Sequence, residues 1–189
     1  MGISYLGFLV IFLVGFVFSA TMADGKEDKE VPTTVESVDL NRYTGLWYEI
    51  ARLPNRFQKQ CIKNVTANYQ LLPDGKIEVV NRCLQTDGEA DEVTGIAKVV
   101  DLATNSRLKV SFFRPLGISL FWGDYWIIGL GTNYDYAVVG TPDRKYGWIL
   151  ARQARLEQKQ LEEIFNLLRQ QGYRPEDFVM TLQQYENTE

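Results

Sequence analysis

The side chains that could act as nucleophiles, proton carriers or metal ligands are few in this sequence. Its 189 residues include two cysteines and no histidine. Without histidine, the chain cannot build a Ser-His-Asp or Cys-His catalytic site, a haem site with a proximal histidine, or a zinc site that uses histidine. The acidic residues show no spacing typical of a metal site. We therefore expect no catalytic residue, no metal and no other cofactor.

The two cysteines, Cys61 and Cys83, flank a predicted β-hairpin and allow two interpretations. An even number of cysteines favours a disulfide if the chain is exported to an oxidising compartment. A straight ladder with Pro73 opposite Lys76 would set Cys61 opposite position 88, so the disulfide requires the chain near Cys61 to leave the ladder. In the second interpretation Cys83 is a free thiol that points inward and attacks a bound lipid, without a histidine to activate it.

One acid, Glu49, occupies an inward position of a predicted strand over residues 45–52, between Trp47 and Ala51 on the same face. Burial disfavours a charged carboxylate unless a partner compensates it. Either a neighbouring tyrosine or arginine pairs with Glu49 near the floor of the fold, or Glu49 recognises a hydroxyl or ammonium group of a ligand.

The charge and length of the chain restrict its partners and its architecture. The sequence has 20 Lys and Arg residues and 24 Asp and Glu residues, a net charge of −4. A mildly acidic chain lacks the basic surface of a nucleic-acid-binding protein, so we expect no nucleic-acid partner. The length fits a single folded domain.

The first 38 residues are predicted to lie outside that domain. Ile3 to Ala20 form an uncharged apolar run followed by small residues, which predicts a cleaved signal peptide over residues 1–23, with an uncleaved anchor as the alternative. Residues 24–38 are rich in charge, proline and threonine and are predicted to be a tether. We therefore expect an exported protein whose domain covers residues 39–185.

The elements that position these side chains are predicted from short runs with a period of two residues, which is typical of half-buried strands. Turn signals such as Pro73-Asp74-Gly75 separate the runs. The runs lie near residues 45–52, 64–71, 76–79, 92–101, 107–113, 124–130, 134–141 and 146–152. Eight short strands joined by tight turns predict an all-β fold, an eight-stranded antiparallel up-and-down β-barrel.

One segment near the C-terminus has a helical period instead. Leu161, Ile164, Phe165 and Leu168 recur at helical spacing, and Gly172 stands where a C-terminal cap belongs. We expect this helix to pack on the outside of the barrel, and we expect a short ninth strand within residues 178–183.

The alternation also assigns the side chains that would line the barrel. Besides Trp47 and Glu49, the inward face carries Ala51, Val65, Ala67, Tyr69, Ile77, Val79, Asn81, Gly95, Ala97, Val99, Leu108, Val110, Phe112 and Trp148. Eight strands leave room either for a side-chain core or for one small ligand. Glycine and alanine among these positions favour a cavity, and a filled core is the alternative.

Several segments, in order along the chain, resemble the motifs of the lipocalin family. Residues 41–52, with the sequence Asn-Arg-Tyr-Thr-Gly-Leu-Trp-Tyr-Glu-Ile-Ala-Arg, resemble the opening Gly-x-Trp motif, and residues 148–152, Trp-Ile-Leu-Ala-Arg, resemble a later strand. The resemblance implies a cup closed at one end with an apolar ligand inside. It also implies that Gly45 and Trp47 belong to the closed end and that Arg152 lies across the Trp47 indole as a cation–π contact.

The resemblance points to the subgroup of bacterial lipocalins and apolipoprotein D, and it implies a lipid carrier, not an enzyme. It further implies fatty acids or lysophospholipids as ligands and a role in membrane maintenance under stress. If the host is bacterial, it implies a protein of the periplasm or the outer membrane, although no cysteine near the signal junction could receive a lipid anchor.

The mouth of the cup is expected to expose apolar side chains. They are Phe57 on one loop and Phe113, Leu116, Phe121 and Trp122 on another. Such a loop predicts a lid over the cavity, contact with a membrane surface, or self-association, in a protein that is a monomer or a homodimer. The alternative function is a ligand-free module that binds protein through the Phe113–Trp122 surface.

Overall fold

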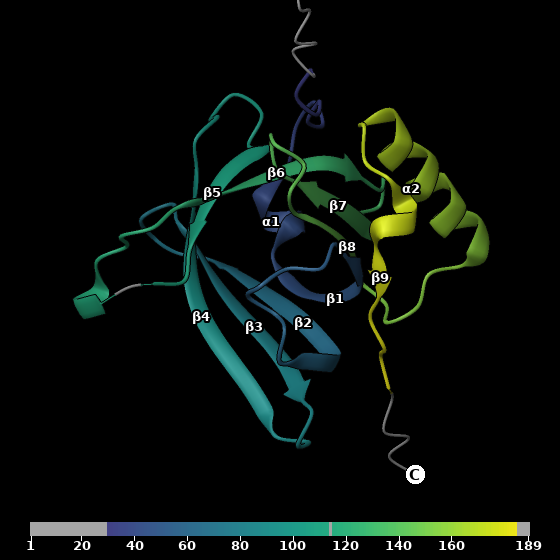
Figure 1. Ribbon diagram of the computed structural model, residues 1–189. Helices are drawn as coiled ribbons and strands as arrows, with labels where there is room; N and C mark the ends of the chain where they lie inside the picture. Colours follow the sequence, from purple (N-terminus) through teal and green to yellow (C-terminus); the bar gives the residue numbers. More distant parts are fainter. Residues whose placement is uncertain (1–29, 114, 185–189) are drawn as a thin grey trace, which may run out of the picture.

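A computed structural model describes residues 30–113 and 115–184 and shows a closed β-barrel with a helix beside it (Figure 1). The barrel strands are β1 (Gly45–Arg52), β2 (Cys61–Leu71), β3 (Ile77–Gln85), β4 (Ala90–Val99), β5 (Arg107–Ser111), β6 (Gly123–Leu130), β7 (Tyr136–Gly140) and β8 (Gly147–Ala151). Each strand pairs antiparallel with the next, and β1 also pairs with β8, which closes the sheet. The predicted eight-stranded antiparallel barrel is therefore confirmed.

The turn between β2 and β3 forms as its residues predict. Gly75 has a φ of +78°, a conformation that residues with a side chain rarely adopt. Asp74 Oδ1 accepts a hydrogen bond from the Lys76 backbone N–H at 3.0 Å. This turn sets Leu71 opposite Ile77 and fixes the register of the hairpin.

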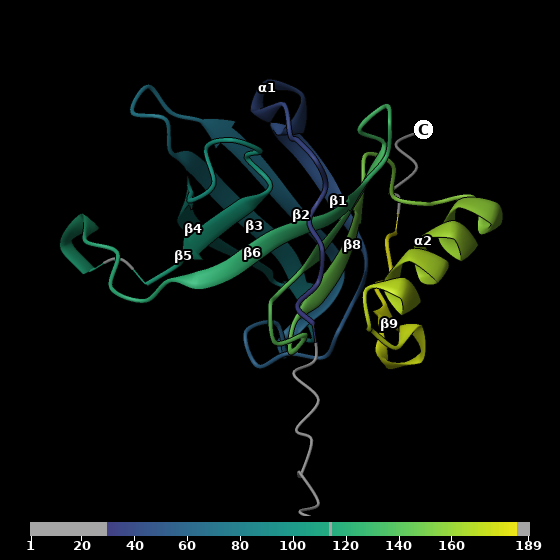
Figure 2. The same cartoon turned by 90° about the horizontal axis from the view of Figure 1, so that it is seen from above.

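Helices accompany the barrel at two places (Figure 2). The longer, α2 (Gln158–Gln170), packs on the outside of the barrel as expected and buries Ile164 and Leu168 completely. The sequence does not predict α1 (Leu40–Tyr43), a single turn whose first backbone N–H groups are capped by the Asp39 carboxylate. Short 3₁₀ turns at Pro115–Gly117 and Pro175–Asp177 and a two-residue strand, β9 (Val179–Met180), complete the described elements.

Adjacent residues of the strands form two separate apolar clusters. The inner cluster, inside the barrel, contains the buried residues Val38, Tyr43, Trp47, Ala67, Tyr69, Ile77, Val79, Ala97, Leu108, Ile127, Ala137, Val139 and Leu150. The outer cluster, under α2, contains Ile50, Ala51, Ile128, Val138, Ile149, Ala151, Ile164, Leu168, Tyr173 and Phe178. The sheet thus buries both of its faces where α2 covers it.

The segment after α2 completes the wall between β1 and β2. These two strands pair directly at only four positions. Beyond them β9 pairs with β1, and the Asn64 backbone N–H donates a hydrogen bond to the Leu182 carbonyl at 2.8 Å. The Gln183 side-chain amide donates to the backbone carbonyls of Glu49 and Val65, each at 2.8 Å. One side chain therefore bridges the two strands.

The chain before α1 lies against the barrel, which corrects part of the predicted tether. Val38 is 2% exposed, and its backbone N–H donates to the Thr104 carbonyl at 2.7 Å. The backbone N–H of Val35 donates to the Ile127 carbonyl at 2.9 Å, and both valines pack on the inner cluster. Apolar burial attaches residues 35–38 to the domain. The predicted signal peptide, the start of the tether and residue 185 lie outside the described residues.

In the described part of the chain, no helix combines the length and the apolar character that a membrane span requires.

Candidate functional site

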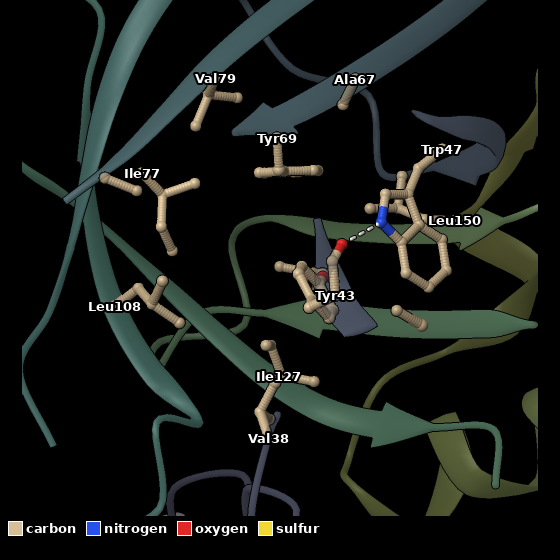
Figure 3. Packing of buried hydrophobic residues seen from close by; sticks show 13 residues of the cluster. Val38, Tyr43, Trp47, Ala67, Tyr69, Ile77, Val79, Leu108, Ile127 and Leu150 are labelled. Atoms are coloured by element: carbon tan, nitrogen blue, oxygen red, sulfur yellow. Dashed lines mark hydrogen bonds between the residues drawn. The ribbon is translucent and has the colours of Figure 1, made fainter. Parts of the chain in front are cut away.

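Trp47 and Arg152 close one end of the barrel together with α1. Trp47 is fully buried, and its indole Nε1 donates a hydrogen bond to the Tyr43 carbonyl at 2.8 Å (Figure 3). The Arg152 guanidinium lies 3.9 Å from the centre of a Trp47 ring, the expected cation–π contact. It also donates to the backbone carbonyls of Arg42, Tyr43, Thr44, Leu46 and Tyr134. A Cβ at Gly45, where φ is +93°, would lie 3.4 Å from Arg152 Nη1. We term this the closed end.

Most of the residues predicted to line the barrel lie in the inner cluster. Ala67, Tyr69, Ile77, Val79, Ala97 and Leu108 are buried there. Val99, Val110 and Trp148 pack against the same cluster and remain partly exposed. Val65 is buried beside the two cysteines, and Asn81 is half-buried opposite Ala67 on the neighbouring strand.

Four side chains that pack on the inner cluster are not fully buried. Val99, Val110, Tyr125 and Trp148 pack on the inner cluster, yet each stays partly exposed to solvent. Partial exposure of side chains that face the barrel interior indicates that solvent reaches part of this lining. Figure 3 shows side chains of β2, β3, β5 and β6 directed into one shared interior space. The apolar lining of the barrel interior is therefore the candidate site for a small hydrophobic ligand.

The predicted positions of Ala51 and Phe112 in the lining, and the interpretation of Gly95 as a sign of empty volume, require correction. A β-bulge in β1 between Glu49 and Ala51 changes the side to which Ala51 points, and Ala51 is fully buried in the outer cluster. Gly95 does not mark empty volume, because a Cβ there would lie 2.5 Å from the ring of Phe112. Phe112 covers Gly95 and is itself 38% exposed, so it borders the cavity without being enclosed in it.

Three tyrosine hydroxyls from separate elements meet within the inner cluster. Tyr125 Oη on β6 lies 2.7 Å from Tyr43 Oη on α1 and 2.9 Å from Tyr69 Oη on β2. Burial raises the pKa of Tyr69 to about 12 and raises the pKa values of Tyr43 and Tyr125 well above the usual value for tyrosine. All three hydroxyls are therefore protonated at neutral pH. We term these residues the tyrosine cluster.

Glu49 belongs to a hydrogen-bond network under the loop that joins β1 to β2. The side chain is 2% exposed, and its carboxylate pairs with Arg52 and accepts a hydrogen bond from Gln58 Nε2 at 2.7 Å. The hydroxyl of Thr181 also donates to this carboxylate, and the Trp148 indole donates to Gln58 Oε1 at 2.9 Å. The interpretation of a paired acid with an arginine partner is confirmed. The pair lies toward the open end, since Gln58 comes from a loop there, and not at the floor as expected.

Cys61 and Cys83 form a disulfide, with their Cα atoms 5.5 Å apart. Two register shifts in β2, on either side of Lys63, bring Cys61 opposite Gln85 and next to Cys83. The chain near Cys61 therefore stays in the ladder, which corrects the expectation that it leaves it. Because each sulfur is bonded to the other, Cys83 is not available as a nucleophile.

Aromatic side chains mark a path from the open end to the cavity wall. Phe57 is 56% exposed, and its ring centre lies 5.5 Å from that of Tyr146. Tyr146 in turn stacks on Trp148, with ring centres 6.0 Å apart. The side chain of Trp148 reaches both the network of Glu49 and the inner cluster.

The loop between β5 and β6 exposes several large apolar side chains at this end and projects away from the barrel in both views (Figures 1 and 2). Its exposed side chains are Phe113, Leu116, Ile118, Leu120 and Phe121. Trp122 is partly buried, with Lys98 Nζ 4.3 Å from its ring centre. We term residues 113 and 115–122 the mouth loop.

Sequence reasoning missed several residues of the inner cluster. In β6, β7 and β8 apolar residues stand next to each other, as in Val138-Val139, so a two-residue period does not tell which one faces inward. The missed residues from these strands are Tyr125, Ile127, Ala137, Val139 and Leu150. Tyr43 was missed because it lies in the single turn of α1, outside every strand.

Known proteins resemble this chain over most of its length. A family model described as a lipocalin-like domain matches residues 38–183. The chain is 35% identical to temperature-induced lipocalin-1 of Arabidopsis thaliana over 149 residues, which cover 77% of this chain and 80% of that protein. It is 36% identical to the outer membrane lipoprotein Blc of Escherichia coli over 152 residues, 80% of this chain and 82% of the relative.

Two animal proteins also resemble this chain, one in sequence and one in fold. Apolipoprotein D of Macaca fascicularis is 35% identical over 146 residues, 72% of each chain. Among solved structures, insecticyanin from the tobacco hornworm Manduca sexta matches with a TM-score of 0.66 and 23% identity, over 84% of this chain and 86% of that one. The likeness to insecticyanin concerns the fold.

Proposed function

Because this chain belongs to the lipocalin family, whose members bind small hydrophobic ligands and are not enzymes, we propose that it carries single-chain lipids, namely fatty acids and lysophospholipids. The observation that carries this proposal is the apolar lining of the barrel interior, which is partly exposed at Val99, Val110 and Trp148. A chain of methylene groups would cover that lining without demanding a particular geometry.

The energy of binding in this proposal comes from the acyl chain. Burying one methylene group contributes about 0.8 kcal/mol, so each added methylene strengthens binding roughly fourfold until the cavity is full. Several methylenes suffice for micromolar affinity after the cost of association. In this proposal the barrel takes one acyl chain, so we expect two-chain lipids to bind poorly.

A chain-length series tests the proposal. We expect unbranched fatty acids to displace a fluorescent fatty acid with an affinity that rises with length and then levels off. Lysophosphatidylcholine should compete in the same assay, and phosphatidylcholine with two chains should not. Native mass spectrometry of the purified protein should also detect a co-purified lipid. Affinities that do not depend on chain length would contradict the proposal.

The mouth loop supports contact with a membrane surface during lipid exchange. Leu116 is fully exposed and Phe121 is 71% exposed, which is unusual for large apolar side chains. We expect Leu116→Ser and Phe121→Ser to reduce co-sedimentation with phospholipid vesicles. Leu102→Ser is the matched control, because Leu102 is 83% exposed on the β4–β5 turn, at the other end of the barrel. Capture of a protein partner by lipid-free protein, lost in the two mouth-loop variants, would favour the alternative of an interaction module.

The proposal places this carrier outside the cytoplasm, where it would support membrane maintenance. The disulfide supports an oxidising compartment. If the host is bacterial, the periplasm and the outer membrane are the compartments we propose. Fractionation of the native host with an antibody against this chain tests the location.

A further inference from the structure

The tyrosine cluster has more hydrogen-bond donors than it uses. Three hydroxyls supply three O–H donors, and the two contacts made by Tyr125 Oη consume two of them. Within residues 30–113 and 115–184, no other hydrogen bond involves these hydroxyl groups. At least one of these O–H groups therefore lacks an acceptor among the described residues, which is costly in an apolar environment until an acceptor arrives.

The position of the cluster directs this donor toward the cavity. Tyr43 and Tyr69 are 2% and 7% exposed, and both lie among the apolar side chains of the inner cluster (Figure 3). Tyr125 packs on the same cluster but stays partly exposed, so its ring borders the open space. Tyr43 belongs to α1, which closes the barrel, and a ligand that enters from the open end would reach the cluster with its leading end.

The charges around the cluster favour an uncharged ligand group. The buried polar or charged side chains of the described residues are Glu49, Ser106, Ser111 and Thr141, and none of them is a cation. The guanidinium of Arg152 is occupied by five backbone carbonyls at the closed end. The Arg152 charge acts on Tyr43 from a distance, but its N–H groups donate elsewhere, so a carboxylate at the cluster would have no ion-pair partner in contact. Burying it there costs more than burying a ketone or a hydroxyl.

On the basis of the proposed carrier function, we propose that Tyr43, Tyr69 and Tyr125 form a hydrogen-bonding site at the bottom of the cavity for an uncharged acceptor oxygen at the leading end of the ligand. The ligand class is then an oxygenated lipid, whose chain carries a ketone or hydroxyl at the end opposite its polar head. A plain acyl chain fills the same cavity with a methyl group against an unpaired O–H.

Matched pairs of probes test this site. Each pair consists of a fatty acid and the acid of the same length that carries a ketone next to its terminal methyl group. A ketone accepts hydrogen bonds and donates none, so it reports on the tyrosine donors alone. The probes are compared across several chain lengths by displacement of a fluorescent fatty acid.

The variant that removes the site is Tyr43→Phe/Tyr69→Phe/Tyr125→Phe. Phenylalanine keeps the rings, and replacing all partners of a hydrogen bond by apolar groups of the same shape costs little stability. We expect the affinity of the keto acid relative to its parent acid to fall about fivefold or more in this variant, the value of one neutral hydrogen bond. Tyr48→Phe is the matched control, because Tyr48 packs on the outer cluster, and it should leave the ratio unchanged.

A spectroscopic measurement on the unmodified protein does not depend on any variant. With a ¹³C label in the ketone, we expect its infrared stretching band to shift to lower frequency in the complex than in hydrocarbon solvent, as it does in an alcohol. A band at the hydrocarbon frequency, or a relative affinity that the triple variant does not change, would overturn the site while leaving the carrier function intact. If neither acid of any pair binds at any length, the carrier function itself fails, and this site fails with it.

Discussion

On three neighbouring strands the residue that faces the cavity and the residue that faces α2 stand side by side: Ile127 and Ile128, Val139 and Val138, Leu150 and Ile149. The outer residues pack against Ile164 and Leu168 of the helix, both fully buried. The inner residues share their cluster with side chains that solvent still reaches. Similar amino acids therefore pack under a helix on one face and line the barrel interior on the other, and their composition does not distinguish the two.

The largest expected effect separates the two clusters by their response to truncation. Leu168→Ala should lower the free energy of unfolding by about 4 kcal/mol, because it leaves a closed void in the outer cluster. Leu108→Ala in the inner cluster should cost about 2 kcal/mol, because solvent already reaches other side chains that pack on this cluster. Denaturant unfolding measures both, and equal losses would contradict the distinction between core and cavity.

The disulfide between β2 and β3 contributes to stability separately from the two apolar clusters. Cys61 and Cys83 close a loop with a sequence separation of 22, and removal of such a bridge should cost about 3 kcal/mol. Cys61→Ser/Cys83→Ser should therefore unfold at lower denaturant than the parent protein. Reduction of the parent with dithiothreitol should reproduce the loss, and the same reductant should not affect the double variant.

Replacing a valine by phenylalanine should lower stability on the outer face and lower ligand affinity on the inner face. Val138→Phe overfills the outer cluster and should cost about 1–3 kcal/mol of stability. Val110→Phe extends into the cavity, so its stability should change by less than about 1 kcal/mol. Its affinity for a long-chain fatty acid should fall at least about tenfold, because it removes space that more than one methylene would occupy. Unchanged binding by Val110→Phe would show that ligands lie elsewhere.

The smallest expected effect is the dependence of stability on pH, which distinguishes the buried tyrosines of the cluster from exposed tyrosines. Burial raises the pKa of Tyr69 to about 12, above the value of about 10 in an unfolded chain. The folded state then holds its proton more tightly, so this contribution to stability is complete below about pH 10 and is lost as the pH rises toward about 12. A tyrosinate absorbance titration should show late-titrating groups that Tyr43→Phe/Tyr69→Phe/Tyr125→Phe removes. Titration of all tyrosines near pH 10 in the folded protein would contradict the buried cluster.

The strand positions and the helix could be predicted because period-two and helical spacing report directly on burial. Turn chemistry such as Asp74-Gly75 also located one hairpin, but the predicted register was wrong by one position, because Leu72 and not Pro73 lies opposite Lys76. The two-residue period fails where a bulge intervenes, as at Ala51, and where both faces are buried, as in Val138-Val139.

The candidate site was predictable in outline and not in its polar details. Inward positions such as Ala67, Val79 and Val110 follow from alternation alone. The partners of Glu49 and the meeting of Tyr43 with Tyr125 depend on contacts between segments far apart in the sequence. Hydrogen-bond geometry of that kind leaves no periodic trace in a single sequence.

The bridge that Gln183 makes between β1 and β2 has a consequence for biosynthesis. Residues 179–184 leave the ribosome after all eight strands, yet the gap beside β1 is sealed only when they arrive. The barrel wall is therefore completed late, by contacts between parts of the polypeptide that are far apart in sequence. Contacts of such long range slow folding.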